Sequence, residues 1–188
     1  MKSILTILVF SIVTPLSIIA QNKSFQIGGK IINELTFHNG FAPGFGGQII
    51  YKMGTHGGIE SGLFYQSKPI GFNFIVSSVT GSNYYFAKIS ERRILFPIFY
   101  RFNSKVINFS AGPIMDYFIN WKTRSASQGV SVNNYDRNAL QIIASAGVSK
   151  TIWLSGKWLI EPEVLFNFNI TEEDGGVALN FCFRKKLF

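Results

Sequence analysis

Few side chains in this sequence could perform acid–base or nucleophilic chemistry. The chain has two histidines, His38 and His56, and one cysteine, Cys182. A hydrolytic triad needs a histidine beside a serine, and His38 with Asn39 and Ser67 offers a fragment of one. No G-x-S-x-G or comparable nucleophile motif accompanies it. We therefore predict that the protein is not an enzyme and that His38 is a loop residue without a catalytic role.

Closely spaced acidic residues raise two further chemistries, glycoside hydrolysis and cation binding. Glu161 and Glu163 lie two residues apart and so share one face of a strand, whereas glycoside hydrolysis needs two carboxyl groups across a cleft. The acidic segment 172–174 has ligand types that suit a divalent cation, but a solvated acidic turn explains it better. The lone Cys182 provides no disulfide and no metal-ligand spacing. We predict no cofactor and no metal site.

The elements that must position these side chains are long strands. From Val106 to Trp121 the apolar residues recur at every second position, with polar residues between them. This period of two predicts a strand with one apolar and one polar face, longer than strands of soluble domains usually are. The same alternation recurs along the chain. Eight strands are predicted, at about residues 24–37, 43–53, 58–67, 84–102, 106–121, 137–150, 157–170 and 177–184.

The predicted connections alternate in length. Long polar stretches at 68–83 and 122–136 are expected to be loops at one end, and short turns near 54, 103 and 151 are expected at the other. The alternation changes phase between Tyr84 and Arg92, and Pro97 lacks a backbone donor, so a bulge or an unpaired position is expected there. An even strand count with loops of this kind is typical of outer-membrane barrels whose termini lie in the periplasm.

The same alternation would also fit a soluble barrel, with the apolar face turned inward. The apolar faces carry Phe, Tyr, Trp and Ile, which would overfill the narrow interior of eight strands. The chain is 47% hydrophobic but only 15% charged, against roughly 25% charged in ordinary soluble domains. The predicted fold class is therefore all-β, an eight-stranded antiparallel up-and-down transmembrane β-barrel with its polar faces inward.

Charged residues recur on the predicted inner faces. Four bases and five acids nearly balance there, and charges removed from water must be paired or hydrogen-bonded. The predicted lumenal ion-pair network consists of Lys30, Glu34, Glu60, Arg93, Arg101, Asp116, Glu161, Glu163 and Arg184. Packing and solvation of the lumen account for these residues; a proton or ion path would need a continuous wet pore, which eight strands seldom provide.

Aromatic residues gather at both ends of the predicted apolar faces, as in the interfacial girdles of membrane barrels. The predicted girdles comprise Tyr51, Tyr100, Phe102 and Trp158 at the turn end and Tyr65, Tyr117, Trp121 and Phe168 at the loop end. Lysines and arginines lie near both rims, which suits anionic lipid head groups. We predict contact with outer-membrane lipid and no binding of nucleic acid.

The first twenty residues, Met1–Ala20, read as a secretory signal cleaved before Gln21, although a short membrane anchor is the alternative. Cleavage would remove Lys2 and leave a net charge of +7 on the barrel domain, residues 21–188. The predicted location is the outer membrane of the cell. At the other end, Arg184–Phe188 is a basic extension, either a strand running beyond the bilayer or a periplasmic tag.

Five sequence segments carry a resemblance to a known family. They are the signal ending in Ala20-Gln21, GIESGLFYQSK at 58–68, FPIFYRF at 96–102, FSAGPIMDYF at 109–118 and a closing strand rich in Gly and Phe. Together they resemble the PorT-like outer-membrane β-barrel family of Bacteroidetes over about residues 21–183. The resemblance implies an eight-stranded barrel without catalytic residues. It also implies an alternative role as an accessory subunit of a type IX-like protein secretion system, with secretion-system or other envelope proteins as partners.

Overall fold

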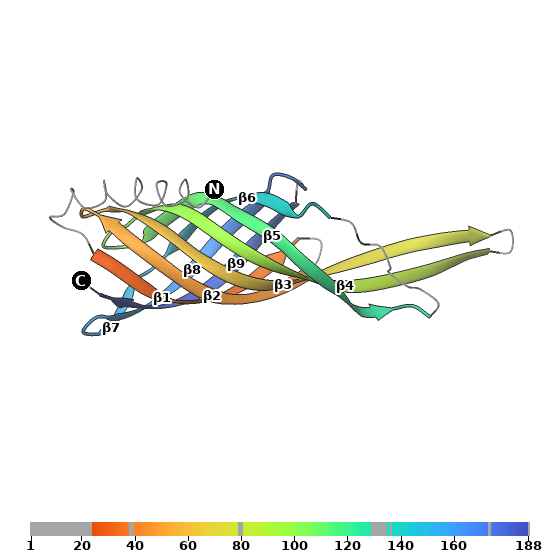
Figure 1. Ribbon diagram of the computed structural model, residues 1–188, viewed down its shortest axis with the longest axis horizontal. Coiled ribbons are helices and arrows are strands. Elements are labelled where there is room, and N and C mark those ends of the chain that lie inside the picture. The colour runs from red at the N-terminus through yellow and green to blue at the C-terminus, as the bar shows by residue number, and fades with distance from the viewer. Residues whose placement is uncertain are drawn as a thin grey trace, which may run out of the picture.

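Alternating side chains build a sheet of nine antiparallel strands that closes on itself (Figure 1). The computed structural model describes residues 24–37, 40–78, 81–128, 135, 137–172 and 174–187. The strands are β1 (Ser24–Thr36), β2 (Gly40–Met53), β3 (Gly57–Ser78), β4 (Gly81–Phe102), β5 (Asn108–Ala126), β6 (Leu140–Ser149), β7 (Ile152–Ser155), β8 (Trp158–Asn169) and β9 (Asp174–Lys186). The predicted signal segment 1–20 and His38 lie outside the described residues.

Eight of these strands form the ring. Neighbours in sequence pair from β1 to β6, then β6 pairs with β8, β8 with β9, and β9 with β1. The short β7 pairs with the first residues of β8, Ile152 opposite Ile160, and extends the wall at the turn end. The predicted eight-stranded antiparallel up-and-down barrel is confirmed. None of the described residues forms a helix long and apolar enough to cross a membrane.

The two faces of the wall have the predicted polarity. Phe166 and Ile98 are 58% and 41% exposed on the outside, whereas Glu163 and Arg101 are 3% and 1% exposed inside. Other outward residues such as Phe45 and Phe181 are exposed to a similar extent. Apolar surface on this scale is unstable in water and stable in hydrocarbon, and closure leaves no unpaired strand edge within the ring. The soluble-barrel alternative is therefore wrong.

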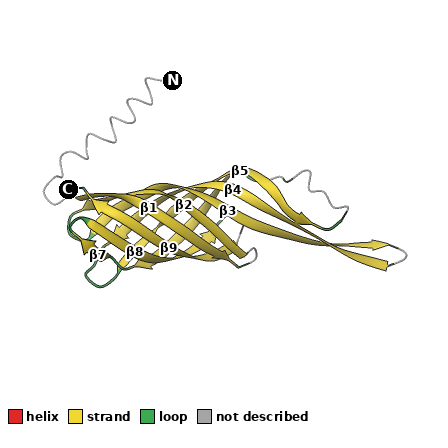
Figure 2. Cartoon of the chain, turned by 90° about the horizontal axis from the view of Figure 1, so that it is seen from below, coloured by secondary structure: helices red, strands yellow, loops and turns green. Residues whose placement is uncertain are grey.

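The first long connection is not the loop that the sequence predicted, and the second is a loop over a shorter stretch than predicted. β3 and β4 pair continuously from Ser67 opposite Arg92 to Ser78 opposite Gly81, so residues 68–83 belong largely to a hairpin. β5 likewise continues to Ala126. Gly, Ser and Asn obscure the strand pattern in each half alone, but the halves satisfy each other's backbone groups across the turn. Figures 1 and 2 show this hairpin projecting beyond the barrel, away from the C-terminal end.

The irregularities expected in the fourth strand are present. The β4–β5 register shifts between Lys88 and Ile89 and again between Arg92 and Arg93, where the change of phase predicted a bulge. The β3–β4 register is interrupted opposite Pro97, whose carbonyl accepts a hydrogen bond from Ser61 Oγ at 2.9 Å. The extra residues at these two shifts, Ile119 and Arg124, lie on β5. β4 itself keeps its register with β3 there and alternates regularly, so Glu91 faces inward on the same side as Arg93.

Candidate functional site: a closed lumen beneath a projecting hairpin

Six of the predicted charged residues form one continuous chain in the lumen near the turn end. Lys30 Nζ lies 2.6 Å from Glu60 Oε1 and 2.9 Å from Glu163 Oε2. Arg101 contacts Glu60 at 2.7 Å and also pairs with Glu161. Arg184 pairs with the other oxygen of Glu161. Three cations and three carboxylates alternate in this chain, so their charges cancel.

Neutral side chains satisfy many of the remaining hydrogen-bonding groups of this turn-end chain. Thr151 Oγ1 donates to Glu161 at 2.7 Å, and Asn180 Nδ2 donates to Glu163 at 2.9 Å. Arg101 donates to Asn103 Oδ1 at 3.0 Å. Removing a carboxylate from such a setting leaves a buried cation without its partner, which is strongly destabilising. The charges of this chain are therefore held by one another and by neutral side chains within the lumen.

A second group of charges occupies the lumen at the loop end, and the sequence identified only part of it. Arg93 lies 2.8 Å from Asp116 and 3.2 Å from Glu91. Glu91 pairs in turn with Arg137, which reaches Glu172 at 3.0 Å. Of these residues, Glu91, Arg137 and Glu172 were missed. Glu91 lies in the stretch that was given a change of phase, although β4 alternates regularly there and places it on the same face as Arg93. Arg137 begins the predicted sixth strand, and Glu172 lies in a predicted turn.

Glu34 stands apart from both groups of ion pairs. Its two oxygens accept hydrogen bonds from Gln66 Nε2 at 2.8 Å and Asn167 Nδ2 at 2.9 Å. Near it, Lys68 lies 3.7 Å from Asp174. The predicted single network is thus two separate clusters of charges and one amide-bound carboxylate.

An apolar layer separates the two charged clusters. It contains Ile32, Phe64, Leu95, Phe99, Ile114, Ile143, Leu165 and Ala178, from every ring strand except β2. β2 contributes Gly46, where an added Cβ would lie 2.6 Å from the Phe64 ring. Gly62 on β3 is equally close to that ring, so two glycines make room for one inward phenylalanine. The sequence pattern did not reveal this layer, because apolar residues were assigned to the outside.

The described lumen has no open passage at this layer. The cavity beside Phe64 and Leu95 has a volume of about 30 Å³, room for roughly two water molecules, and a second cavity near Lys68 has about 10 Å³. Solutes and ions need a continuous wet path to cross, and the layer interrupts it.

The β3–β4 hairpin beyond the barrel has an unusual composition for an exposed element. From Pro69 to Ala87 it carries no charged residue. Pairing of β3 with β2 ends at Gln66, and pairing of β4 with β5 ends at Ala87, so beyond these points no described third strand joins the hairpin. At the usual rise of a strand, the ribbon beyond Gln66 is about 40 Å long. On it, Tyr84 is 80% exposed.

A described part of the second loop packs against the base of this hairpin. The Tyr135 ring lies 5.8 Å from Phe72 of β3, 6.2 Å from Phe118 and 6.1 Å from Trp121 of β5, centroid to centroid. Its hydroxyl donates to Glu91. Burial, together with this hydrogen bond, raises the pKa of Tyr135 above its usual value. The phenol therefore stays protonated and connects the loop to the lumenal charges.

The predicted girdle residues lie outside the lumen. Tyr65, Tyr100, Phe102, Tyr117, Trp158 and Phe168 are exposed, and Tyr51 and Trp121 are half-buried. His56, in the β2–β3 turn, stacks on Phe102 at 5.6 Å, and its Nδ1 lies 3.0 Å from the Asn103 carbonyl oxygen. These contacts give His56 a structural place at the end of β4. Among described residues, no three His, Cys, Asp or Glu side chains gather as a metal site requires.

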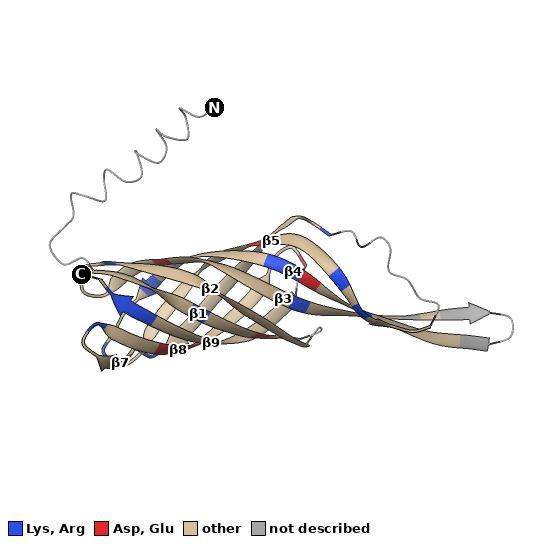
Figure 3. Ribbon diagram, turned by 60° about the horizontal axis from the view of Figure 1, so that its bottom comes forward, with Lys and Arg blue, Asp and Glu red and all other residues tan. Residues whose placement is uncertain are grey.

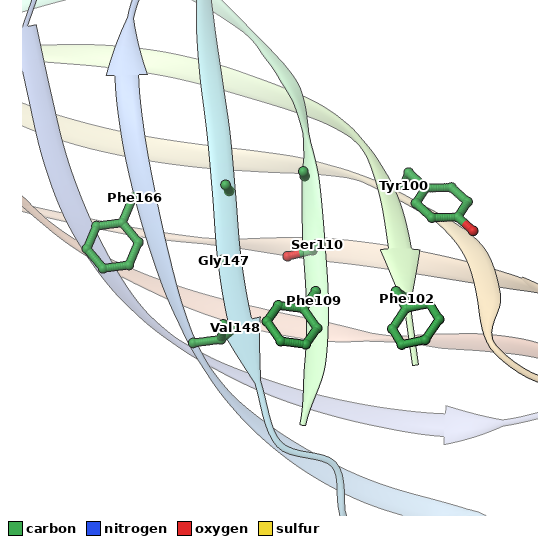
Figure 4. A pocket seen from close by; sticks show the side chains of 9 residues that line it. Tyr100, Phe102, Phe109, Ser110, Gly147, Val148 and Phe166 are labelled. Atoms are coloured by element: carbon green, nitrogen blue, oxygen red, sulfur yellow. The ribbon is translucent and has the colours of Figure 1, made fainter. Parts of the chain in front are cut away.

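Three apolar hollows mark the outer surface of the described barrel. One lies over β5 and β6, where Ala111 and Ala146 are paired small residues, and has a volume of about 320 Å³. Figure 4 shows Tyr100, Phe109 and Phe166 around it. A second, of about 310 Å³, lies over β6, β8 and β9. The third, of about 620 Å³, crosses the strands from β7 to β2 near the turn end.

No family model and no curated protein matches this chain. Among solved structures, the N-terminal β-barrel domain of Pseudomonas aeruginosa OprF is 12% identical, over 87% of this chain and 99% of that one, with a TM-score of 0.45. Neisserial surface protein A is 12% identical over 88% and 97%, with a TM-score of 0.44. Ail of Yersinia pestis, crystallised with the heparin analogue sucrose octasulfate, is 10% identical over 88% and 97%, with a TM-score of 0.41.

Proposed function

We propose that this protein is a non-enzymatic outer-membrane β-barrel that holds the β3–β4 hairpin outside the cell as a binding element. The barrel anchors the hairpin in lipid, and the apolar layer with its two charged clusters keeps the lumen closed. Residues 1–20 would direct export and be removed near Ala20. The long connections then face outward, and the turn end with the C-terminal residues faces the periplasm.

The hairpin carries this proposal. An uncharged ribbon with Ile75, Tyr84 and Phe86 exposed would be a liability in water unless another surface covers it. Its strands have no described third neighbour, so an extended segment of another protein can add to an edge through backbone hydrogen bonds. The expected partner is therefore another envelope protein that contributes a strand or an apolar surface.

Photo-crosslinking in intact cells tests this role directly. A photoreactive phenylalanine at Tyr84 should form a discrete protein adduct, because that side chain is 80% exposed on the hairpin. The same residue at Tyr100, 58% exposed on the lipid-facing wall, is the matched control and should not form that adduct. Identical products at the two positions, or none at Tyr84, would count against a binding role for the hairpin.

The alternative role, an accessory subunit of a type IX-like secretion system, rests on the resemblance of residues 21–183 to the PorT-like family. The hairpin would then contact secretion components. Deleting the gene separates the two roles: a secretion subunit should leave cargo proteins inside the cell, whereas a binding barrel should leave the secreted proteins unchanged. Recovery of secretion components as the Tyr84 adduct would favour the secretion role.

A further inference from the structure

The outer hollow of about 620 Å³, which we call the turn-end groove, is bounded by apolar side chains of five strands, β1, β2, β7, β8 and β9. Its outward lining includes Ile31, Phe45, Ile160, Pro162, Phe181 and Phe183. Its floor includes Gly29, where an added Cβ would have no described heavy atom closer than 3.8 Å. Figure 2 shows the strands that form this part of the wall. The groove is therefore an elongated apolar recess in a surface that otherwise carries bulky side chains.

An aromatic stack joins this groove to positive charge. Phe183, which lines the groove, stacks on Trp158 with ring centroids 4.9 Å apart. The Lys185 ammonium lies 5.2 Å from the centroid of the Trp158 ring. Lys186 N donates to the Lys157 carbonyl oxygen at 2.8 Å, so Lys157, next to Trp158, lies at the same rim, whereas the Lys186 side chain faces inward opposite Gln26. Tryptophan and lysine together are typical of the boundary between hydrocarbon and head groups.

These lysines are not neutralised by described residues of the protein. The described carboxylates are buried in the lumen except for Glu172 and Asp174, and both of these lie at the loop end. No described ion pair involves Lys157, Lys185 or Lys186. Figure 3 shows the basic residues near the C-terminal end of the chain. The rim next to the groove therefore attracts an anion from outside the protein.

We propose that the turn-end groove binds one anionic glycerophospholipid of the periplasmic leaflet. An acyl chain lies along the apolar recess over Gly29, and the phosphate rests on Lys185 and its neighbour Lys157. This site rests on the proposed outer-membrane location, which turns this rim toward the periplasm. It differs from general lipid contact because the recess and the unneutralised charge meet at one place.

Native mass spectrometry of the full chain, released from micelles containing equal amounts of phosphatidylglycerol and phosphatidylcholine, tests the site. The wild-type barrel should retain one phosphatidylglycerol in preference to phosphatidylcholine. Lys185→Gln with Lys157→Gln should lower that retention, roughly fivefold for each lysine removed. Gly29→Leu should abolish it by filling the recess. Ala146→Leu, in the hollow over β5 and β6, and Lys105→Gln, at the β4–β5 turn, are controls that should retain the lipid.

Three results would overturn the lipid site. The first is equal retention of the two lipids by the wild-type barrel. The second is an equal loss of phosphatidylglycerol retention in Ala146→Leu and Gly29→Leu. The third is a wild-type dimer that Gly29→Leu converts to a monomer, because a second copy of the chain would then occupy the groove. Each variant is first checked for the gel shift on boiling that folded barrels show. Failure of the wild-type chain to show that shift counts against the membrane barrel itself, whereas a folded but unselective barrel counts against this site alone.

Discussion

At the scale of single residues, two adjacent glycines of β2 have opposite surroundings. An added Cβ at Gly46, inside, would lie 2.1 Å from the Leu63 carbonyl oxygen, whereas at Gly47, outside, the nearest atom is 4.0 Å away. We expect Gly46→Ala to lower the free energy of unfolding by about 1–3 kcal/mol through overpacking. Gly47→Ala should leave it unchanged or slightly raised. Urea unfolding in detergent measures both, and equal effects would contradict the assigned faces.

The carboxylate shared by two arginines is the residue on which the turn-end charges depend most. Glu161→Gln would remove the negative charge between Arg101 and Arg184, which are each 1% exposed. We expect a loss of about 3–5 kcal/mol in the free energy of unfolding, because buried cations lose their partner. Glu172→Gln, at a side chain 37% exposed, is the control and should cost less than about 1 kcal/mol. A small effect of Glu161→Gln would show that water already solvates this part of the lumen.

The charges themselves could be predicted from the sequence, but their grouping could not. Alternation places Lys30, Glu60 and Glu163 on inner faces whatever the register. Which of them meet depends on the stagger of the strands around the ring. Glu91 escaped prediction because the stretch from Tyr84 to Arg92 was assigned a change of phase, whereas β4 alternates regularly and places Glu91 on the same face as Arg93. Phe64 escaped prediction because two glycines on neighbouring strands make its space.

At the scale of elements, the loop containing Tyr135 is held to the barrel by a protonated phenol. The pKa of Tyr135 is raised, so its hydrogen bond to Glu91 is present below the ordinary tyrosine pKa and is lost as pH rises through the higher folded-state value. Absorbance titration at alkaline pH should show that Tyr135→Phe removes a tyrosine ionising later than the exposed ones. A difference curve centred near the ordinary value of about 10 would contradict this contact.

The hairpin should be dispensable for the barrel that carries it. The ring closes through the β1–β9 and β6–β8 pairings, which lie outside residues 69–87. Replacing that segment by a short glycine–asparagine turn should leave the gel shift on boiling intact while abolishing the adduct expected at Tyr84. Loss of the folded, unboiled form in this deletion variant would show that the hairpin instead stabilises the barrel.

Prediction of elements from the sequence worked where one face meets hydrocarbon and failed where both faces meet water. β6 and β8 lie within three residues of their predicted limits, because the apolar face is continuous there. The outer halves of β3 and β4 are strands for a different reason, because their backbones pair with each other. Gly, Ser and Asn are frequent there, so apolar and polar residues do not alternate clearly in the sequence. The basic C-terminal residues belong to a strand as far as Lys186, because β9 continues to pair with β1 up to that residue.

At the scale of the whole molecule, the polarity of the barrel is the reverse of that of a soluble protein, and its interior also contains an apolar layer. Apolar side chains such as Phe166 face outward, charges such as Arg101 face inward, and an apolar layer around Phe64 divides the charges. The first two features follow from composition and alternation. The third does not, since an inward and an outward phenylalanine differ only in the register that places them.

Neighbouring isoleucines on β6 provide the most direct test of this arrangement. Ile142 is 47% exposed and Ile143 is 6% exposed, so two consecutive residues of the same type are placed on opposite faces. Each isoleucine is replaced by cysteine in a Cys182→Ala background, and the cysteine is labelled with a nitroxide. The relaxation of the nitroxide by oxygen and by a water-soluble nickel chelate is then measured in lipid vesicles. Position 142 should respond strongly to oxygen, as in hydrocarbon, and position 143 weakly to both. Strong oxygen access at 143 together with nickel access at 142 would contradict the barrel described here.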